Sequence, residues 1–236
     1  MGTSVLERIK NGLVVSCQAR EGNPLRGPQF MLAMAQAAAL GGAVGIRAEG
    51  EEDIRTIKEQ VPLPLIGLIK RNYPDSPVYI TPTAREVKQV LNAGADIVAI
   101  DATDQVRPGQ RKPESVRELV DIVHRAGKLA MADISTRDEA LRAETMGFDL
   151  VGSTLSGYTP YSPKLIGPDL PLVQSITTSC RIPVIAEGRY WTPEEVKQAL
   201  ELGAWAVVVG TAITNPWLIT QRFVSHITRH REERSG

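Results

Sequence analysis

Four copies of one short pattern divide this chain into similar quarters. In each copy a helical stretch leads through a glycine into an apolar run, and the copies read ALGGAVGI, NAGADIVAI, TMGFDLVGS and ELGAWAVVV. Their glycines, Gly41, Gly94, Gly147 and Gly203, are 53, 53 and 56 residues apart. Each interval has room for two strand–helix units, which indicates an internally repeated fold. Glycine suits this point because the C′ position of a helix favours a left-handed φ.

Eight short runs rich in Val, Ile, Leu and Ala are predicted to be strands. They are apolar along nearly their whole length rather than alternating, which is typical of parallel strands covered by helices. The runs are residues 13–17, 43–47, 64–69, 96–100, 128–132, 149–153, 183–187 and 205–209.

Helical segments separate these runs. Three of them have a threonine followed three residues later by a glutamate, which is the signature of a capping box at a helix start. The pairs are Thr83 and Glu86, Thr136 and Glu139, and Thr192 and Glu195. The other helices are expected at residues 28–40, 51–59, 113–126, 169–178 and 215–230.

This alternation predicts an α/β protein whose eight parallel strands close into a (β/α)8 TIM barrel. Crossovers between parallel strands are right-handed, and eight strand–helix units of this kind form a closed barrel. With 236 residues the chain has the usual length for that fold, so residues 1–236 are expected to form one domain. The competing open, doubly wound sheet would carry a glycine-rich nucleotide loop after its first strand, and QAREGNPL is no such loop.

Charge and cysteine content exclude several classes of partner. The 27 basic and 27 acidic side chains cancel, and no basic stripe favours a nucleic acid or an anionic membrane. Cys17 and Cys180 lie outside any CxxC spacing, so both are expected to be reduced thiols, without a zinc site. No run has the length of a membrane span or of a secretory h-region. The protein is expected to be cytoplasmic.

Polar residues or glycines follow all eight apolar runs. Because the carboxyl ends of barrel strands surround the catalytic mouth, we expect these residues to meet there. They are Gln18, Arg47, Lys70, Asp101, Asp133, Thr154, Glu187 and the pair Gly210–Thr211. Charged residues end five of the runs, which favours a functional site over solvated strand ends. A buried ring of mutually neutralising charges is the alternative for some of them, and Asp101 could equally bond the loops of the mouth.

The loops after the seventh and eighth runs predict a phosphate site. In this fold they are the usual phosphate cradle, and here they read EGRYWTPEE and VGTAITNP. Gly188 and Gly210 let backbone N–H groups approach an anion, and a helix start adds its dipole. Arg189 could add a charge-assisted hydrogen bond. A small phosphorylated substrate is therefore expected.

Eight stretches, in order between about residues 7 and 227, resemble the N-acetylmannosamine-6-phosphate 2-epimerase family. They are SCQAREGNPL, GIRAEG, GLIKRNYPDSPVYITPT, IDATDQVRP, MADIST, GSTLSGYTPYS, IAEGRYWTPE and VVGTAITNP. The lysine-containing third stretch and STLSGYT are specific, whereas AEGR and VGTAI recur in several phosphate-binding barrels. One departure follows the fourth run, where Gln105 stands at a position that is often arginine in the family, although Arg107–Pro108 is kept.

The resemblance implies an isomerase that interconverts N-acetylmannosamine 6-phosphate and N-acetylglucosamine 6-phosphate, a step in sialic acid breakdown. Inverting C2 means removing the proton beside the C1 carbonyl of the open-chain sugar and returning one to the other face. This chemistry requires no redox or metal cofactor. It does require a base, a group that stabilises the enolate oxygen, and a hold on the phosphate.

The resemblance also assigns the base at C2 to Lys70. A lysine that acts near neutrality needs its pKa lowered by roughly three units from about 10.4, which burial and a neighbouring cation such as Arg47 can supply. Glu187 is expected to act as acid and base at the O1/O5 end. A two-base variant, in which Glu187 works on the opposite face of C2, is also open. Asp133 and Gln18 are expected to position hydroxyl or acetamido groups.

Two other functions fit the same residues. A Schiff-base aldolase would use the same lysine as a nucleophile, and a regulatory barrel would only bind a sugar phosphate. The loop that carries Tyr158 and Tyr161 could serve as a lid over the sugar. The apolar segment PWLITQRFVSHI indicates a homodimer, which the family generally forms.

Overall fold

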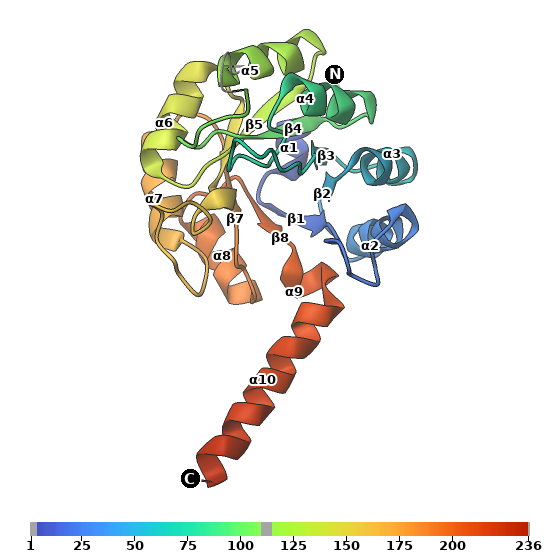
Figure 1. Cartoon of the computed structure of the whole chain (residues 1–236), viewed down its shortest axis with the longest axis vertical. Coiled ribbons are helices and arrows are strands. Elements are labelled where there is room, and N and C mark those ends of the chain that lie inside the picture. The colour runs from blue at the N-terminus through green and yellow to red at the C-terminus, as the bar shows by residue number, and fades with distance from the viewer. Residues whose placement is uncertain (1–3, 110–114, 236) are drawn as a thin grey trace.

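The computed structural model describes residues 4–109 and 115–235 and has a closed barrel of eight parallel strands at its centre (Figure 1). The strands pair in chain order, and the last one closes on the first. They are β1 (Gly12–Cys17), β2 (Gly45–Glu49), β3 (Leu65–Leu68), β4 (Ile97–Asp101), β5 (Leu129–Asp133), β6 (Leu150–Gly152), β7 (Val184–Glu187) and β8 (Ala206–Val209). The predicted (β/α)8 fold is confirmed.

One strand was predicted two residues too early. The expected run ended at Arg47, but β2 begins at Gly45 and continues to Glu49. A strand usually ends where charge begins, and Arg47 breaks this rule because its side chain is buried against a carboxylate inside the barrel. Arg47 therefore lies in the middle of its strand rather than at the end.

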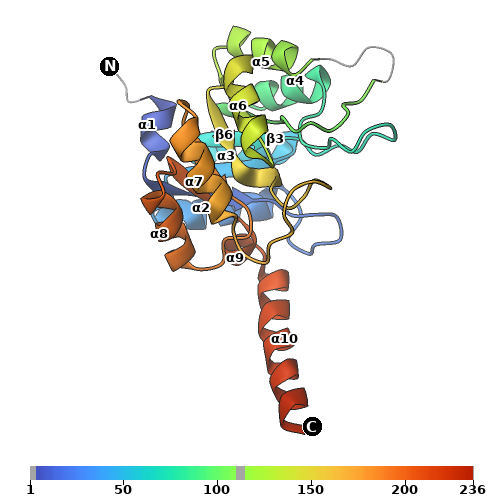
Figure 2. The same ribbon diagram turned by 90° about the vertical axis from the view of Figure 1, so that its left-hand side faces the viewer.

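Helices surround the barrel and alternate with its strands (Figures 1 and 2). They are α1 (Val5–Ile9), α2 (Pro28–Leu40), α3 (Glu51–Gln60), α4 (Ala84–Asn92), α5 (Val116–Arg125), α6 (Arg137–Met146), α7 (Leu170–Ser179), α8 (Pro193–Glu201), α9 (Thr211–Thr214) and α10 (Pro216–Ser235). The expected helices are present within a few residues, whereas α1 and α9 were not expected. The expected start of α5 at residue 113 lies outside the described residues.

The helices begin at the capping residues that the sequence predicts. Capping boxes are present at Thr83, Thr136 and Thr192, as predicted, and a fourth is formed by Ser115 and Glu118. Each box satisfies two backbone groups that a helix end would otherwise leave without partners. The structure therefore fixes where four of the outer helices begin.

The repeated glycines behave as predicted in three of the four quarters. Gly94, Gly147 and Gly203 each have a φ of +94° after a helix. Gly41 was predicted wrongly, because its φ is −76° and it still belongs to the right-handed turn. The next residue, Gly42, takes the left-handed conformation with a φ of +91°. The sequence ALGG offers two glycines, and the helix runs one residue further before it ends.

Alternation along the strands decides which side chains enter the barrel. Successive side chains point to opposite faces, so every second residue of each strand points inward. Below the mouth the inward positions are apolar and form one buried cluster, which includes Ile66, Ile97, Met131, Ile185 and Val208. Because this cluster fills the interior, a site can form only above it, at the carboxyl ends of the strands.

Helix α10 leaves the barrel instead of covering it, and Figure 2 shows it extending well beyond the other elements. The short α9 follows β8 and turns the chain into this helix. Its apolar side chains include Trp217, Phe223, Val224 and Ile227, which are 50%, 70%, 55% and 53% exposed. Among the described residues, no helix is long and apolar enough to cross a bilayer.

Candidate active site

A cavity of about 570 Å³ opens at the carboxyl end of the barrel. Most of the residues that the sequence predicts for the site line this cavity, and they lie on six different strands or directly after them. They are Gln18, Arg47, Lys70, Thr154, Glu187, Gly188, Arg189, Gly210 and Thr211. Asp133 lies against them, because it is bonded to Arg47 and to Thr154. The structure thus brings ten of the eleven residues expected at the mouth together, and the exception is Asp101.

A buried ionic cluster forms the floor of the cavity. Arg47 on β2 binds the carboxylate of Asp133 on β5 with both terminal nitrogens, at 2.6 and 3.2 Å. Its Nη1 also lies 3.0 Å from Oε2 of Glu187 on β7. The hydroxyl of Thr154 lies 2.7 Å from Asp133 Oδ1 and 3.0 Å from Glu187 Oε2. These contacts join three strands and hold each side chain in one orientation.

Burial changes the acidity of Glu187. The loss of water around its carboxyl raises the pKa of Glu187 to about 7, although the charge of Arg47 opposes this change. The neighbouring carboxylate of Asp133 raises it further, since two negative charges repel. A carboxyl group with this pKa can donate a proton at neutral pH and take it back, which is the property of a general acid and base.

Lys70 stands at the rim of the cavity, two residues beyond the end of β3. Its Nζ donates to the side-chain oxygen of Gln18 at 2.5 Å. Water reaches the side chain from the open side, and protein surrounds it on the others. Burial lowers the pKa of Lys70, and the positive charges of Arg47 and Arg20 act in the same direction, against Glu49 and Glu187. The direction is the one that a base requires.

The end of the cavity where the phosphate is expected is formed by Gly188, by Gly210 and by the first residue of α9. Gly188 has a φ of +111°, a backbone conformation that residues other than glycine rarely adopt. At Gly210 an added Cβ would lie 3.2 Å from Cβ of Ser16. The carbonyl of Gly210 accepts bonds from the amides of Ile213 and Thr214 and so begins α9 directly beside the cavity. Backbone N–H groups at such a turn favour an anion.

Arg189 lines the cavity and also makes hydrogen bonds to the loop after β6. Its Nε donates to the carbonyl of Gly167 at 2.8 Å, and its Nη1 donates to the carbonyl of Ser156. Its own φ is +60°, an uncommon value for a residue with a side chain. The guanidinium therefore ties the loop after β6 to the loop after β7.

Asp101 does not line the cavity, although it occupies an inward position at the end of β4. Its Oδ1 accepts bonds from the amide and the hydroxyl of Thr103, at 3.0 and 2.6 Å. Its backbone carbonyl accepts a bond from Arg107. Burial raises the pKa of Asp101 to about 6. Of the two alternatives left open by the sequence, the structure favours a role in bonding the loops of the mouth.

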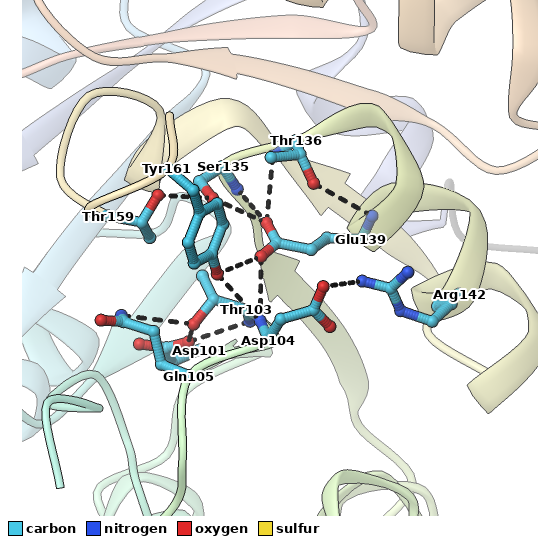
Figure 3. A network of polar contacts seen from close by, with 10 residues as sticks. All are labelled: Asp101, Thr103, Asp104, Gln105, Ser135, Thr136, Glu139, Arg142, Thr159 and Tyr161. Atoms are coloured by element: carbon cyan, nitrogen blue, oxygen red, sulfur yellow. Dashed lines mark hydrogen bonds and ion pairs between the residues drawn. The ribbon is translucent and has the colours of Figure 1, made fainter. Parts of the chain in front are cut away.

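A second polar network, shown in Figure 3, lies beside the cavity and not in it. At its centre the buried Glu139 accepts bonds from Ser135, from the amide of Asp104 and, at 2.6 Å, from the hydroxyl of Tyr161. Tyr161 is bound into this network and does not line the cavity. Gln105 bonds to Thr103 in the same network, so the departure at this position falls outside the cavity.

Several cavity residues were not predicted from the sequence. They are Arg20, Tyr79, Tyr190, Trp191, Trp217 and Leu218, while Tyr158 was considered only as a lid. Arg20 could have been found, because it lies two residues after Gln18 and so has the same inward parity. Trp217 is half exposed and lines the cavity from α10. No strand pattern predicts the direction of a side chain in a loop or a protruding helix.

Comparisons with known proteins agree with this geometry. A family model described as "Putative N-acetylmannosamine-6-phosphate epimerase" matches residues 31–229. Two relatives carry the name "Putative N-acetylmannosamine-6-phosphate 2-epimerase". The one from Caldanaerobacter subterraneus subsp. tengcongensis is 53% identical over 98% of this chain and 97% of its own length. The one from Clostridioides difficile is 51% identical over 94% of this chain and 99% of its own length.

A solved structure is similar over nearly the same span. The N-acetylmannosamine-6-phosphate 2-epimerase from Clostridium perfringens superposes with a TM-score of 0.92 at 50% identity. The match covers 95% of this chain and 97% of that one. The similarity therefore extends over the whole barrel and is not confined to a shared motif.

Proposed function

This chain belongs to the N-acetylmannosamine-6-phosphate epimerase family, and from that premise we propose that its barrel mouth interconverts N-acetylmannosamine 6-phosphate and N-acetylglucosamine 6-phosphate. One observation carries the proposal. A single cavity contains Lys70, whose pKa is lowered, and Glu187, whose pKa is raised, beside a glycine-lined helix start. Two groups shifted in opposite directions supply the base and the acid of a proton-transfer reaction.

Each residue has a part in the reaction. Glu187 enters protonated and donates its proton to the ring oxygen O5 as the C1–O5 bond breaks, and its carboxylate then takes the O1 hydroxyl proton as the C1 carbonyl forms. Lys70 enters as a neutral amine and removes the C2 proton. Arg47, whose charge is held by the buried carboxylate of Asp133, stabilises the enolate oxygen that develops next to C2. The phosphate bound near Gly188 and Thr211 keeps C2 within reach of the amine while a proton is returned to the other face.

We predict a pH profile set by these two groups. Lys70 must be deprotonated, so activity falls at low pH as the amine becomes charged. Glu187 must be protonated, and because its pKa is raised to about 7, loss of its proton limits activity as the pH rises. The result is a bell-shaped dependence of kcat/KM. Replacing Glu187 by Gln should remove the alkaline limb, and a limb that stays in this variant would contradict the assignment.

The same variant separates ring opening from chemistry at C2. Glu187→Gln should lower turnover of the cyclic substrate by about 10²- to 10⁴-fold, the usual effect of losing a general acid. With an analogue that cannot cyclise, exchange of the C2 hydrogen with D2O should persist, because Lys70 is unchanged. NMR measures both reactions. Loss of exchange with both substrates would instead place Glu187 at C2, as the two-base variant requires.

A phosphorylated barrel with a lysine of lowered pKa could also be a Schiff-base aldolase. The direct test incubates the purified protein with N-acetylmannosamine 6-phosphate, with and without borohydride. We expect formation of the C2 epimer and no inactivation by borohydride. A reduced adduct on Lys70 and a cleaved carbon chain would favour the aldolase, and binding without turnover would favour a regulatory barrel.

We also propose a homodimer in the cytoplasm. The exposed apolar side chains of α10 support a second copy of the chain as the partner that covers this surface. The free thiols Cys17 and Cys180 support the location, because free thiols are stable in a reducing compartment. Phe223→Asp should shift the protein toward the monomer in light scattering. His226→Asp, which changes an exposed residue outside this apolar set, should leave the mass unchanged. A Phe223 variant with unchanged mass would contradict this interface.

A further inference from the structure

The side chain of Gln18 makes two hydrogen bonds at once at the edge of the cavity. Its Oε1 accepts from Nζ of Lys70 at 2.5 Å, and its Nε2 donates to Oγ of Ser16 at 2.9 Å. A lysine nitrogen offers N–H donors, so the amide oxygen must face Lys70, and the amide nitrogen is left for the serine. The orientation of the amide is thereby fixed.

Ser16 is a firm support for this amide. It belongs to β1, which pairs with β2 on one side and β8 on the other, and it is only 8% exposed. Its carbonyl accepts a bond from the hydroxyl of Thr214 in α9 at 2.7 Å. Gly210 packs directly against it. Ser16 is therefore held by the barrel and by the helix at the expected phosphate end.

The side chain of Lys70, by contrast, contains four rotatable bonds, so its amine is not fixed by the backbone alone. The backbone amide of Lys70 lies 3.4 Å from Oε1 of Glu49, which holds the main chain but not the amine. Once the ammonium loses a proton, the amine keeps two N–H bonds and one lone pair. If one N–H stays on Gln18 Oε1, rotation about the Cε–Nζ bond is restricted, and the lone pair is confined to the two remaining positions on the nitrogen.

We propose that Gln18, supported by Ser16, is a positioning residue that aims the lone pair of Lys70 at the substrate carbon. The inference rests on the proposed function, because it assumes that Lys70 is the base. It departs from the expectation that Gln18 only binds a hydroxyl or acetamido group. The two roles predict different kinetics, since a residue that acts through the base changes kcat and the acid limb of the pH profile, while a substrate ligand changes KM.

The sharpest variant is Gln18→Glu, which keeps the shape of the side chain and adds a negative charge. A carboxylate beside the amine favours the ammonium and should raise the pKa of Lys70. The acid limb of kcat/KM should then move to higher pH by about 1–3 units, the usual effect of an opposite charge at this distance. If Gln18 contacts only the substrate, the acid limb should stay where it is in the wild-type protein.

Two further variants test the geometry without adding charge. Gln18→Leu removes the acceptor, so kcat should fall about 10- to 100-fold with less than a twofold change in KM, within the range of a misplaced catalytic group. Ser16→Ala leaves the amide without its support and should lower kcat by a smaller factor. A rise in KM with unchanged kcat in both variants would overturn the proposal.

An NMR titration tests the contact without turnover. With ¹³C-labelled lysine and Lys70→Met to assign the signal, Lys70 should titrate at higher pH in Gln18→Glu than in the wild-type protein. Equal titration in the two proteins would overturn the contact. If the wild-type protein shows no hydrogen exchange at C2 while the titration shifts as expected, the proposed function fails and the contact between Gln18 and Lys70 stands.

Discussion

Replacing Lys70 by methionine is expected to lower kcat by about 10²- to 10⁴-fold, the range found when a positioned general base is lost. Methionine keeps the apolar stem of the side chain, so the fold and the shape of the cavity should survive. What disappears is the amine that takes the C2 proton in the proposed mechanism. In the proposed mechanism Glu187 does not replace it, because its proton serves the O1/O5 end of the sugar. Release of the C2 epimer, followed by NMR, measures the loss.

A matched lysine variant controls for a general effect of the lost charge. Lys88 lies on α4, is exposed and does not line the cavity. Lys88→Met should therefore turn over at the wild-type rate. If Lys70→Met retains more than about a tenth of the wild-type rate, general-base catalysis by this residue cannot be upheld.

The second large effect concerns stability. Asp133→Ala should destabilise the protein by about 3–5 kcal/mol, because it removes a bidentate partner from a buried guanidinium. Arg47 is 1% exposed and Asp133 is fully buried, so water cannot replace the lost contacts easily. For a chain of this length the change corresponds to a fall in Tm of about 6–20 °C. Urea unfolding followed by circular dichroism measures it.

A second substitution tests whether the loss of the Asp133 carboxylate from the buried guanidinium is the cause. Adding Arg47→Met to Asp133→Ala removes both partners, so the double variant should be more stable than the single one. Asp138→Ala is the control, since Asp138 is 77% exposed and its pair with Arg137 lies on the surface. That variant should change stability by less than about 1 kcal/mol. A double variant less stable than Asp133→Ala would contradict the explanation.

Much of this molecule could be predicted from its sequence because local rules and the fold agree. The uniformly apolar runs, the capping boxes and the repeated glycines each depend on a few neighbouring residues, and all indicate the same barrel. Inward parity then brings Arg47, Lys70, Asp133 and Glu187 to one end, since these residues fall on the inward register of their strands. The site was predictable to the same extent as the strands.

The failures have equally physical causes. Arg47 was placed at the end of its strand because charge usually marks solvent, whereas a carboxylate three strands later in the chain compensates its burial. Asp101 has the parity of a site residue, but its carboxylate is used by the loop that follows it. Trp217 reaches the cavity from a helix that leaves the barrel. Such contacts depend on distant segments, which local sequence does not encode.

The role of Lys70 as a base at C2 is tested most directly by NMR of the protein with N-acetylmannosamine 6-phosphate in D2O. A lysine that removes this proton exchanges it with solvent before returning one, so deuterium should accumulate at C2 of both epimers as they interconvert. The same sample with Lys70→Met should show neither the new epimer nor the label. Interconversion over many turnovers without deuterium at C2 of either sugar would contradict the account.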